Sequence, residues 1–138
     1  MTRTPTIGLL VVIAALSACA PVLPPLNGPG ALDLQHWQVA TLEESHSCFI
    51  LKLNRDGDET AIYERGKPNY ADYFRLTPGR YVIAYQCWYK HADESRSDAV
   101  DLKPGRVYRV HSKRNILSYK VTVWIEDRET REVLAGNR

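Results

Sequence analysis

The sequence lacks the features that mark most enzymes and nucleic-acid-binding proteins. It has no Gly-x-Ser-x-Gly nucleophile motif and no Gly-rich phosphate loop between a strand and a helix. Its 18 Lys and Arg residues are nearly balanced by 16 Asp and Glu residues, so no basic excess draws the chain towards nucleic acid. The sequence therefore predicts no catalytic residues, no cofactor and no nucleic-acid partner.

A long apolar run is missing as well. The apolar stretch at residues 7–16 is shorter than the roughly 20 residues that a membrane-spanning helix requires. It follows the basic residue Arg3 and precedes the small residues Ser17 and Ala18, which is the three-part order of a secretory signal. We therefore expect a secretory signal at the N-terminus. Ordinary signal cleavage near Ala20 and an uncleaved anchor remain the alternatives.

The end of this apolar stretch reads Leu16-Ser17-Ala18-Cys19. It resembles the lipobox of bacterial lipoproteins. The resemblance implies removal of a signal peptide at residues 1–18, lipid attachment (palmitate included) at Cys19, and anchoring to a membrane. In that family, Asp after the lipidated cysteine retains the protein in the inner membrane. Ala20 stands at that position, so the resemblance favours an outer membrane lipoprotein whose domain faces the periplasm.

Cysteine is scarce, and its number fits this location. If Cys19 carries lipid, only Cys48 and Cys87 remain, and a pair of thiols in an oxidising compartment is typically a disulfide. Closing a loop of this length stabilises the fold by roughly 4 kcal/mol according to the chain-entropy argument. The sequence predicts a Cys48–Cys87 disulfide.

A metal site at the same cysteines is the alternative. His46 precedes Cys48 by two residues, and a zinc or copper site could include Cys87 and a further histidine at 36, 91 or 111. The spacing matches no recognised ligand pair, so we expect no metal. The acidic segment 54–59 lacks the alternating oxygen ligands of a calcium loop, and its Asp-Gly pair predicts a hairpin turn instead.

Residues 19–30 contain four prolines and two glycines, which disfavour both helix and paired strand. We expect a lipidated tether that lifts the domain roughly 30 Å from the bilayer at ~3.1 Å per residue. Packing of Val22, Leu23 and Leu26 along the domain edge is the alternative.

Residues 31–138 have the length of a single domain, and no window of ten residues shows a helical apolar period. Short segments rich in Val, Ile, Tyr and Trp alternate with turn residues, which is typical of strands. Alternation is clearest at residues 81–87, where odd positions share one face, and at residues 119–125. The predicted strands are 37–42, 47–54, 60–64, 70–76, 81–89, 99–102, 107–112, 119–126 and 132–134.

Two Leu-x-Pro-Gly corners, at residues 76–81 and 102–108, each end with Tyr. Pro followed by Gly predicts a type II turn with positive φ at Gly79 and Gly105. These corners and the closing segment 126–136 resemble those of prealbumin-like domains, which are common among bacterial lipoproteins. The resemblance implies no active residues. We expect an all-β fold, an antiparallel β-sandwich of about 7–9 strands in prealbumin-like or Ig-like style.

These features favour a non-catalytic binding or assembly module that contacts another envelope protein. The predicted contact surface is a strand edge or the segment 88–91, although Trp88 could instead pack over the disulfide, as Trp does in many sandwich cores. The alternatives are a small-ligand or metal carrier and a periplasmic inhibitor of a lysozyme-like hydrolase. The lipid-anchored lysozyme inhibitors are also small β proteins with disulfides, but the Ser-Gly-x-x-Tyr loop associated with them is absent here.

Overall fold

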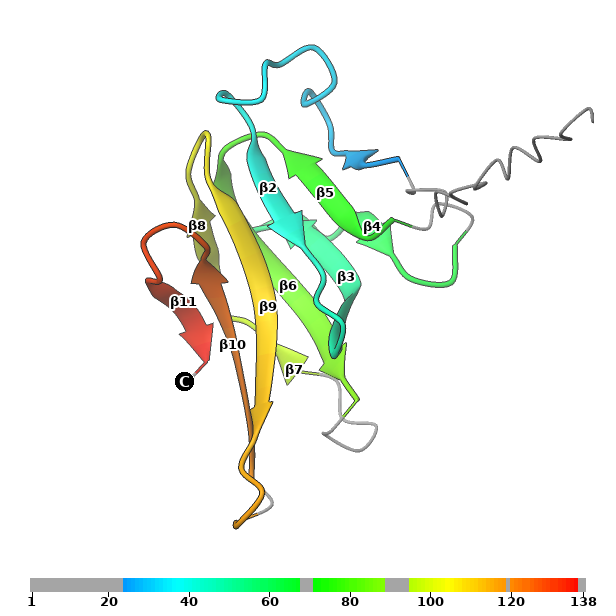
Figure 1. Cartoon of the computed structure of the whole chain (residues 1–138). Helices are drawn as coiled ribbons and strands as arrows, with labels where there is room; N and C mark the ends of the chain where they lie inside the picture. Colours follow the sequence, from blue (N-terminus) through cyan, green and yellow to red (C-terminus); the bar gives the residue numbers. More distant parts are fainter. Residues whose placement is uncertain (1–23, 68–70, 89–94, 119, 137–138) are drawn as a thin grey trace, which may run out of the picture.

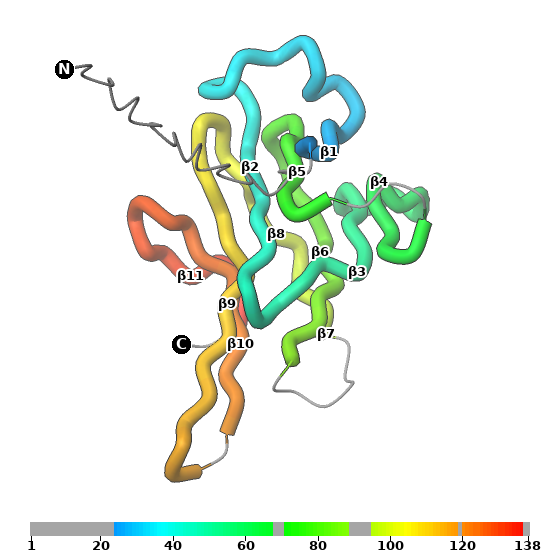
Figure 2. Tube along the Cα trace, turned by 45° about the vertical axis from the view of Figure 1, so that its right-hand side comes forward, coloured from blue at the N-terminus to red at the C-terminus, as the bar shows by residue number. Residues whose placement is uncertain are grey.

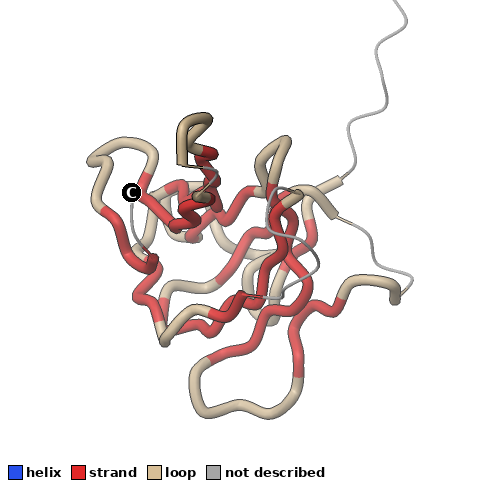
Figure 3. Tube along the Cα trace, turned by 90° about the horizontal axis from the view of Figure 1, so that it is seen from below, coloured by secondary structure: helices blue, strands red, loops and turns tan. Residues whose placement is uncertain are grey.

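The computed structural model of the chain describes residues 24–67, 71–88, 95–118 and 120–136. Within these ranges the structure holds eleven strands in two sheets and no helix (Figures 1 and 3). The predicted signal peptide and Cys19 lie outside the described residues. The all-β sandwich expected from the sequence is confirmed.

The larger sheet contains six strands in the order β1-β5-β2-β9-β10-β11. Two of its pairings are parallel, β1 with β5 and β2 with β9, and the remaining pairings are antiparallel. The expectation of a purely antiparallel sandwich is therefore wrong for this sheet. Its strands are β1 (Leu26–Asn27), β5 (Tyr73–Leu76), β2 (Ala40–Glu43), β9 (Val107–Arg114), β10 (Val121–Asp127) and β11 (Val133–Gly136).

The smaller sheet is built around β6, which pairs with β3 along one side and with β7 and β8 on the other. All of its pairings are antiparallel. Its strands are β4 (Ala61–Glu64), β3 (Cys48–Arg55), β6 (Gly79–Cys87), β7 (Ser95–Arg96) and β8 (Val100–Leu102).

The nine predicted strands correspond to the strands of three or more residues, with shifted ends. The two-residue strands β1 and β7 were not predicted. Strand β1 lies in the segment expected to be an unpaired tether, so that expectation is wrong for Leu26 and Asn27. Both prolines of the Pro24-Pro25 pair precede β1, and Leu26 and Asn27 lie opposite Phe74 and Arg75 at the edge of the sheet, where proline neighbours are tolerated.

The core lies between the two sheets and follows the alternation of the strands. Tyr81, Ile83, Tyr85 and Cys87 are all buried on one face of β6, as expected. In β10, Ile125 belongs to the same core and Val123 packs against it. The largest buried apolar side chains include Leu42, Ile50, Leu53, Phe74, Leu76, Leu102 and Tyr108.

Both Pro-Gly corners carry the chain from one sheet to the other. The first joins β5 to β6 and the second joins β8 to β9. Positive φ is confirmed at both glycines, with 69° at Gly105 and 151° at Gly79. The value at Gly79 is far from the +80° of a type II turn, because the connection is only two residues long and Gly79 is already the first residue of β6.

Each corner is closed by the tyrosine that ends its motif. The Tyr81 hydroxyl donates to the Thr77 carbonyl oxygen at 2.6 Å. The Lys103 N–H donates to the Tyr108 hydroxyl oxygen at 2.9 Å. In both motifs the partner is the residue before the proline, so the repeated Tyr has the same structural role twice.

Candidate binding surface

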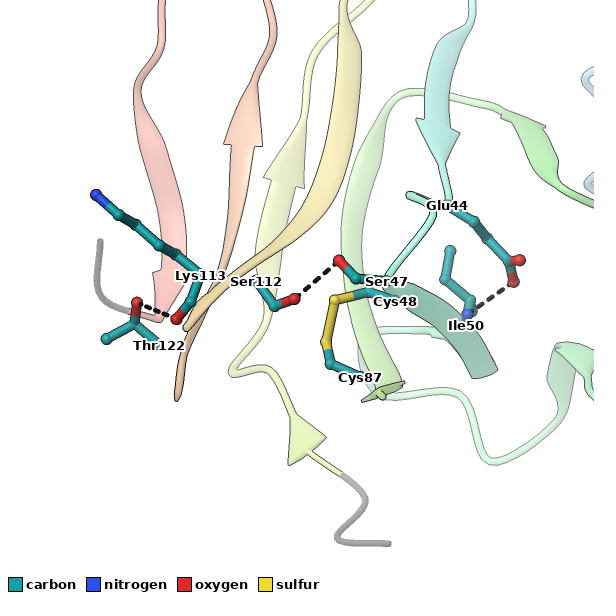
Figure 4. The surroundings of a disulfide bond; sticks show 8 residues. All are labelled: Glu44, Ser47, Cys48, Ile50, Cys87, Ser112, Lys113 and Thr122. Carbon is teal, nitrogen blue, oxygen red and sulfur yellow. Dashed lines mark hydrogen bonds between the residues drawn. A yellow bond between two sulfur atoms is a disulfide. The ribbon is translucent and has the colours of Figure 1, made fainter. Parts of the chain in front are cut away.

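The predicted Cys48–Cys87 disulfide is present and lies at one end of the sandwich (Figure 4). The two cysteines are direct partners in the register of β3 and β6, and both are buried. Next to them, the Ser112 hydroxyl of β9 donates to the Ser47 hydroxyl at 2.8 Å, which ties the two sheets together (Figure 4). The backbone at this end is therefore held by a covalent bond and by an inter-sheet hydrogen bond.

Trp88 follows the disulfide directly and points away from the core. Its backbone N–H donates to the Ser47 carbonyl oxygen at 2.9 Å, while 73% of the residue is exposed. Its ring meets the ring of Phe49 edge-on, with 5.9 Å between the centroids. Trp88 is thus not the buried tryptophan of the alternative interpretation. The other residues of the predicted loop, 89–91, lie outside the described residues.

Arg65 also contacts the Phe49 ring. Its guanidinium carbon lies 4.4 Å from the centroid of the Phe49 ring, within the range of a cation–π contact. Its Nη1 donates to Glu44 Oε1 at 2.8 Å, and the same oxygen accepts the Ile50 N–H at 2.8 Å. Burial raises the pKa of the Glu44 carboxyl above its usual value, and the Ile50 hydrogen bond and the Arg65 charge offset this only in part. Arg65 is therefore fixed over the ring by a carboxylate that is itself held in place.

These side chains line an open groove of about 640 Å³ at the disulfide end of the molecule. One wall is aromatic and the rest carries both signs of charge, so the groove suits an amphipathic ligand or protein surface. The lining residues are Glu44, Ser45, His46, Ser47, Phe49, Arg65, Asp72, Trp88, Arg109 and His111.

Arg109 links the groove to a set of ion pairs on the outer face of the larger sheet. It lies opposite Glu43 in the parallel pairing of β2 and β9, and its Nη2 and Nε donate to Glu43 Oε2 at 2.6 and 3.0 Å. Arg128 donates to the same oxygen at 3.2 Å. The sheet register thus places a carboxylate between two arginines.

A buried carboxylate, Glu126, lies beside this network and was not predicted. Trp124 Nε1 donates to Glu126 Oε2 at 2.8 Å, and Arg131 Nη1 lies 3.1 Å from Oε1. His111 Nε2 lies 3.3 Å from Oε1, and the His111 ring stacks on Trp124 with 5.5 Å between centroids. The sequence feature that indicates this cluster is the two-residue spacing of Trp124 and Glu126, which places both side chains on one face of a strand.

The histidines considered as metal ligands do not come together. His46 is exposed two residues before β3, His36 meets the ring of Trp37 edge-on, and His111 belongs to the Glu126 cluster. His91 lies outside the described residues. In the described part of the chain, no group of three or more His, Cys, Asp or Glu side chains is placed to hold a metal ion.

The acidic segment 54–59 contains the end of β3 and most of the predicted hairpin connection to β4. The Asn54 side-chain amide donates to the carbonyl oxygens of Asp58 and Glu59 at 3.2 and 3.3 Å. Asp58 Oδ1 accepts the Thr60 N–H at 2.9 Å. These contacts are internal to the turn, so it has a structural role.

Strand edges, the other predicted binding mode, are formed in the larger sheet by β1 and β11. In the smaller sheet, β4 lies at one edge, and β7 and β8 lie beyond β6 at the other. All five of these edge strands are short, from two to four residues. Short edges offer few backbone groups for strand addition, so the groove is the better candidate.

Comparison with known proteins found no matching family model, no matching curated protein and no matching solved structure. Over the described ranges, no helix has the length and apolar character needed to cross a membrane.

Proposed function

We propose that the chain is a lipid-anchored protein of the bacterial cell envelope that acts as a non-catalytic binding or assembly module. The resemblance of residues 16–19 to a lipobox supports the anchor. The observation that supports the binding role is the exposure of Trp88 beside Phe49 on the rim of the groove. Another envelope protein is the proposed partner, and the groove is the proposed contact.

The chemistry of the groove is that of an energetically important interface. Trp and Arg are enriched among the residues that dominate binding energies, especially where they are held in one conformation before binding. Here the disulfide and the Ser47 carbonyl fix the backbone of Trp88, and Glu44 fixes Arg65. A partner that covers these side chains gains apolar contact with little further loss of side-chain freedom.

The charged groups of the groove favour recognition over acid–base chemistry. Glu44 accepts hydrogen bonds from Arg65 and from the Ile50 N–H. Arg109 is paired with Glu43. Because these groups stabilise one another, they position the surface and contribute charge complementarity at its rim.

Photo-crosslinking in intact cells tests this function. A benzophenone amino acid replaces Trp88 in one strain and Trp37 in another, since Trp37 is 59% exposed but lies in the segment before β2. We expect position 88 to form an adduct with one envelope protein, identified by mass spectrometry, and position 37 to form none. Coexpression of an excess of the unlabelled parent chain should suppress the adduct, whereas coexpression of a chain carrying Phe49→Ala and Arg65→Ala should not.

Crosslinked adducts of equal yield from positions 88 and 37 would contradict the proposed surface. Equal suppression of the adduct by the parent chain and by the Phe49→Ala/Arg65→Ala chain would contradict it as well. Inhibition of a lysozyme-like hydrolase by the purified protein would favour the inhibitor alternative instead.

A further inference from the structure

The hairpin of β9 and β10 extends beyond the body of the sandwich and ends in an isolated tip (Figure 1). Strand β9 pairs with β2 only over residues 107–109, but it pairs with β10 as far as Arg114. Among the described residues, β9 therefore has no strand paired on its β2 side over residues 110–114, and beyond the Ser112–Ser47 contact it continues as a two-stranded ribbon with β10.

The tip presents two large aliphatic side chains to solvent. Ile116 is 82% exposed and Leu117 is 93% exposed, more than any other large apolar side chain in the described ranges. Within the turn that carries them, Asn115 Oδ1 accepts the N–H groups of Leu117 and Ser118 at 2.9 and 3.2 Å. The Asn115 N–H donates to the Lys120 carbonyl at 2.8 Å and closes the ribbon below the turn.

Basic residues flank this apolar pair on both sides in the sequence. Lys113 and Arg114 precede it and Lys120 follows it, and residues 112–120 contain no Asp or Glu. Lys113 and Lys120 are exposed. The tip thus combines an apolar end with basic residues on both sides of it in the sequence, although the whole chain is nearly neutral.

We propose that this tip inserts into the interface of a lipid bilayer that carries anionic headgroups. Ile116 and Leu117 would reach the boundary of the acyl chains, while Lys113 and Lys120 lie at the level of the phosphates, with their apolar stems along the ribbon. A convex tip with charge on both sides matches a planar anionic surface, whereas a protein pocket would need a shape specific to it. The inference does not rest on the binding role of the groove.

The tip and the N-terminal side of the described chain lie at opposite ends of the molecule. Strand β1 is at the upper end in both views and the hairpin tip is at the lower end (Figures 1 and 2). Contact through the tip is therefore a separate membrane contact from the proposed lipid anchor at Cys19, and it can be measured without lipid on the protein.

The experiment uses residues 20–138, which include all of the described core, from Ala31 to Ile125. Ser118→Cys, labelled with an environment-sensitive dye while the Cys48–Cys87 disulfide is closed, reports insertion. Vesicles of phosphatidylethanolamine with phosphatidylglycerol should cause a blue shift and cosediment with the protein. Vesicles of phosphatidylcholine alone should bind at least about tenfold more weakly, given what each basic residue contributes near an anionic surface.

Two variants separate the apolar contribution from the charge. Ile116→Ser with Leu117→Ser should weaken vesicle binding by at least about tenfold, because burying one large aliphatic side chain raises the affinity by roughly tenfold or more. Lys113→Ser with Lys120→Ser should weaken it by about 25-fold, at roughly fivefold per charge. Leu32→Ser, a change at another exposed leucine, is the matched control and should bind as the parent does.

Three outcomes would overturn the proposal. The first is no binding to anionic vesicles, and the second is unchanged vesicle binding of the Ile116→Ser/Leu117→Ser variant. The third is a photo-crosslink from position 118 to a protein, lost in that variant while its vesicle binding stays unchanged. The altered residues are exposed, so unchanged thermal unfolding should show that each variant is folded.

Discussion

Trp88 meets Phe49 edge-on across the outer face of the smaller sheet, and 73% of Trp88 stays exposed. Because Cys48 pairs with Cys87, Phe49 and Trp88 are diagonal neighbours on the opposite face of the same two strands. The disulfide thus fixes the positions of two rings that do not belong to the core. Their contact makes Trp88 a surface residue in a defined place, which is what a binding role requires.

Trp88→Ala should separate stability from binding. Since the ring is mostly exposed, we expect the free energy of unfolding to change by no more than about 0.5 kcal/mol. Trp124→Phe should cost about 1–3 kcal/mol, because it removes the hydrogen bond to the buried Glu126. Urea unfolding of both variants measures the contrast, and a larger loss for Trp88→Ala would show that it is a structural residue.

Reduction of the Cys48–Cys87 disulfide should lower the free energy of unfolding by about 2–5 kcal/mol, because the unfolded chain regains the freedom of the closed loop. Denaturant unfolding with and without a reductant measures this. A variant with Cys48→Ala and Cys87→Ala is the control and should show no further response to the reductant. Two free thiols in the mass of the non-reduced mature protein would contradict the disulfide.

Much of the fold was predictable because local patterns decide it. Alternation at residues 81–87 identifies the inward face of β6, and the Pro-Gly corners identify two of the places where strands end. The parallel pairing of β2 with β9 was not predictable, since it joins segments far apart in the chain and has no local signal. Strand β7 is only Ser95 and Arg96, which is too short and too polar to show alternation.

The candidate site was only partly predictable. The number of cysteines predicted the disulfide. If the alternation of inward and outward side chains in β6 continues one residue beyond Cys87, Trp88 lies on the outer face. The burial of Glu126 could not be predicted, because its partners come from two strands and from Arg131 beyond β10. A carboxylate near the end of a strand is ordinarily exposed, and only the register of β9 with β10 brings His111 opposite Trp124.

Gly105→Ala should destabilise the second corner by about 1–3 kcal/mol through backbone strain, since φ is 69° there. An added Cβ would also come within 3.2 Å of the Trp37 carbonyl oxygen. Gly57→Ala is the matched control, because φ is 80° but nothing lies within 4 Å of the new atom. We expect Gly105→Ala to be the more costly change in thermal unfolding, and equal costs would show that the Trp37 contact relaxes freely.

Asp127 should make stability depend on pH in the acidic range. Burial raises the pKa of its carboxyl, but hydrogen bonds from the Thr130 and Glu129 N–H groups and the charge of Arg106 outweigh this, so the pKa lies below its usual value. A lowered carboxyl pKa adds stability that is present above about pH 4 and is lost as the pH falls through the folded-state pKa.

Comparison of Asp127→Asn with the parent chain measures this contribution. At pH 7 the parent should be more stable by about 1 kcal/mol, because hydrogen bonds to a charged acceptor are stronger. The difference should shrink in acid, where Asp127 is protonated. A difference that stays constant between pH 7 and pH 3 would mean that Asp127 acts through shape alone.

Cys19→Ala tests the proposed anchor, which rests on the match of residues 16–19 to a lipobox. The parent chain should fractionate with the outer membrane, and the variant should be found in the soluble periplasmic fraction. One acyl chain binds a membrane only marginally, so the several chains of a lipoprotein are needed for stable attachment. Combining Cys19→Ala with Ile116→Ser and Leu117→Ser controls for residual attachment through the hairpin tip. Membrane retention of the combined variant would contradict the anchor, whereas retention of Cys19→Ala alone would show that the tip holds the domain at the bilayer.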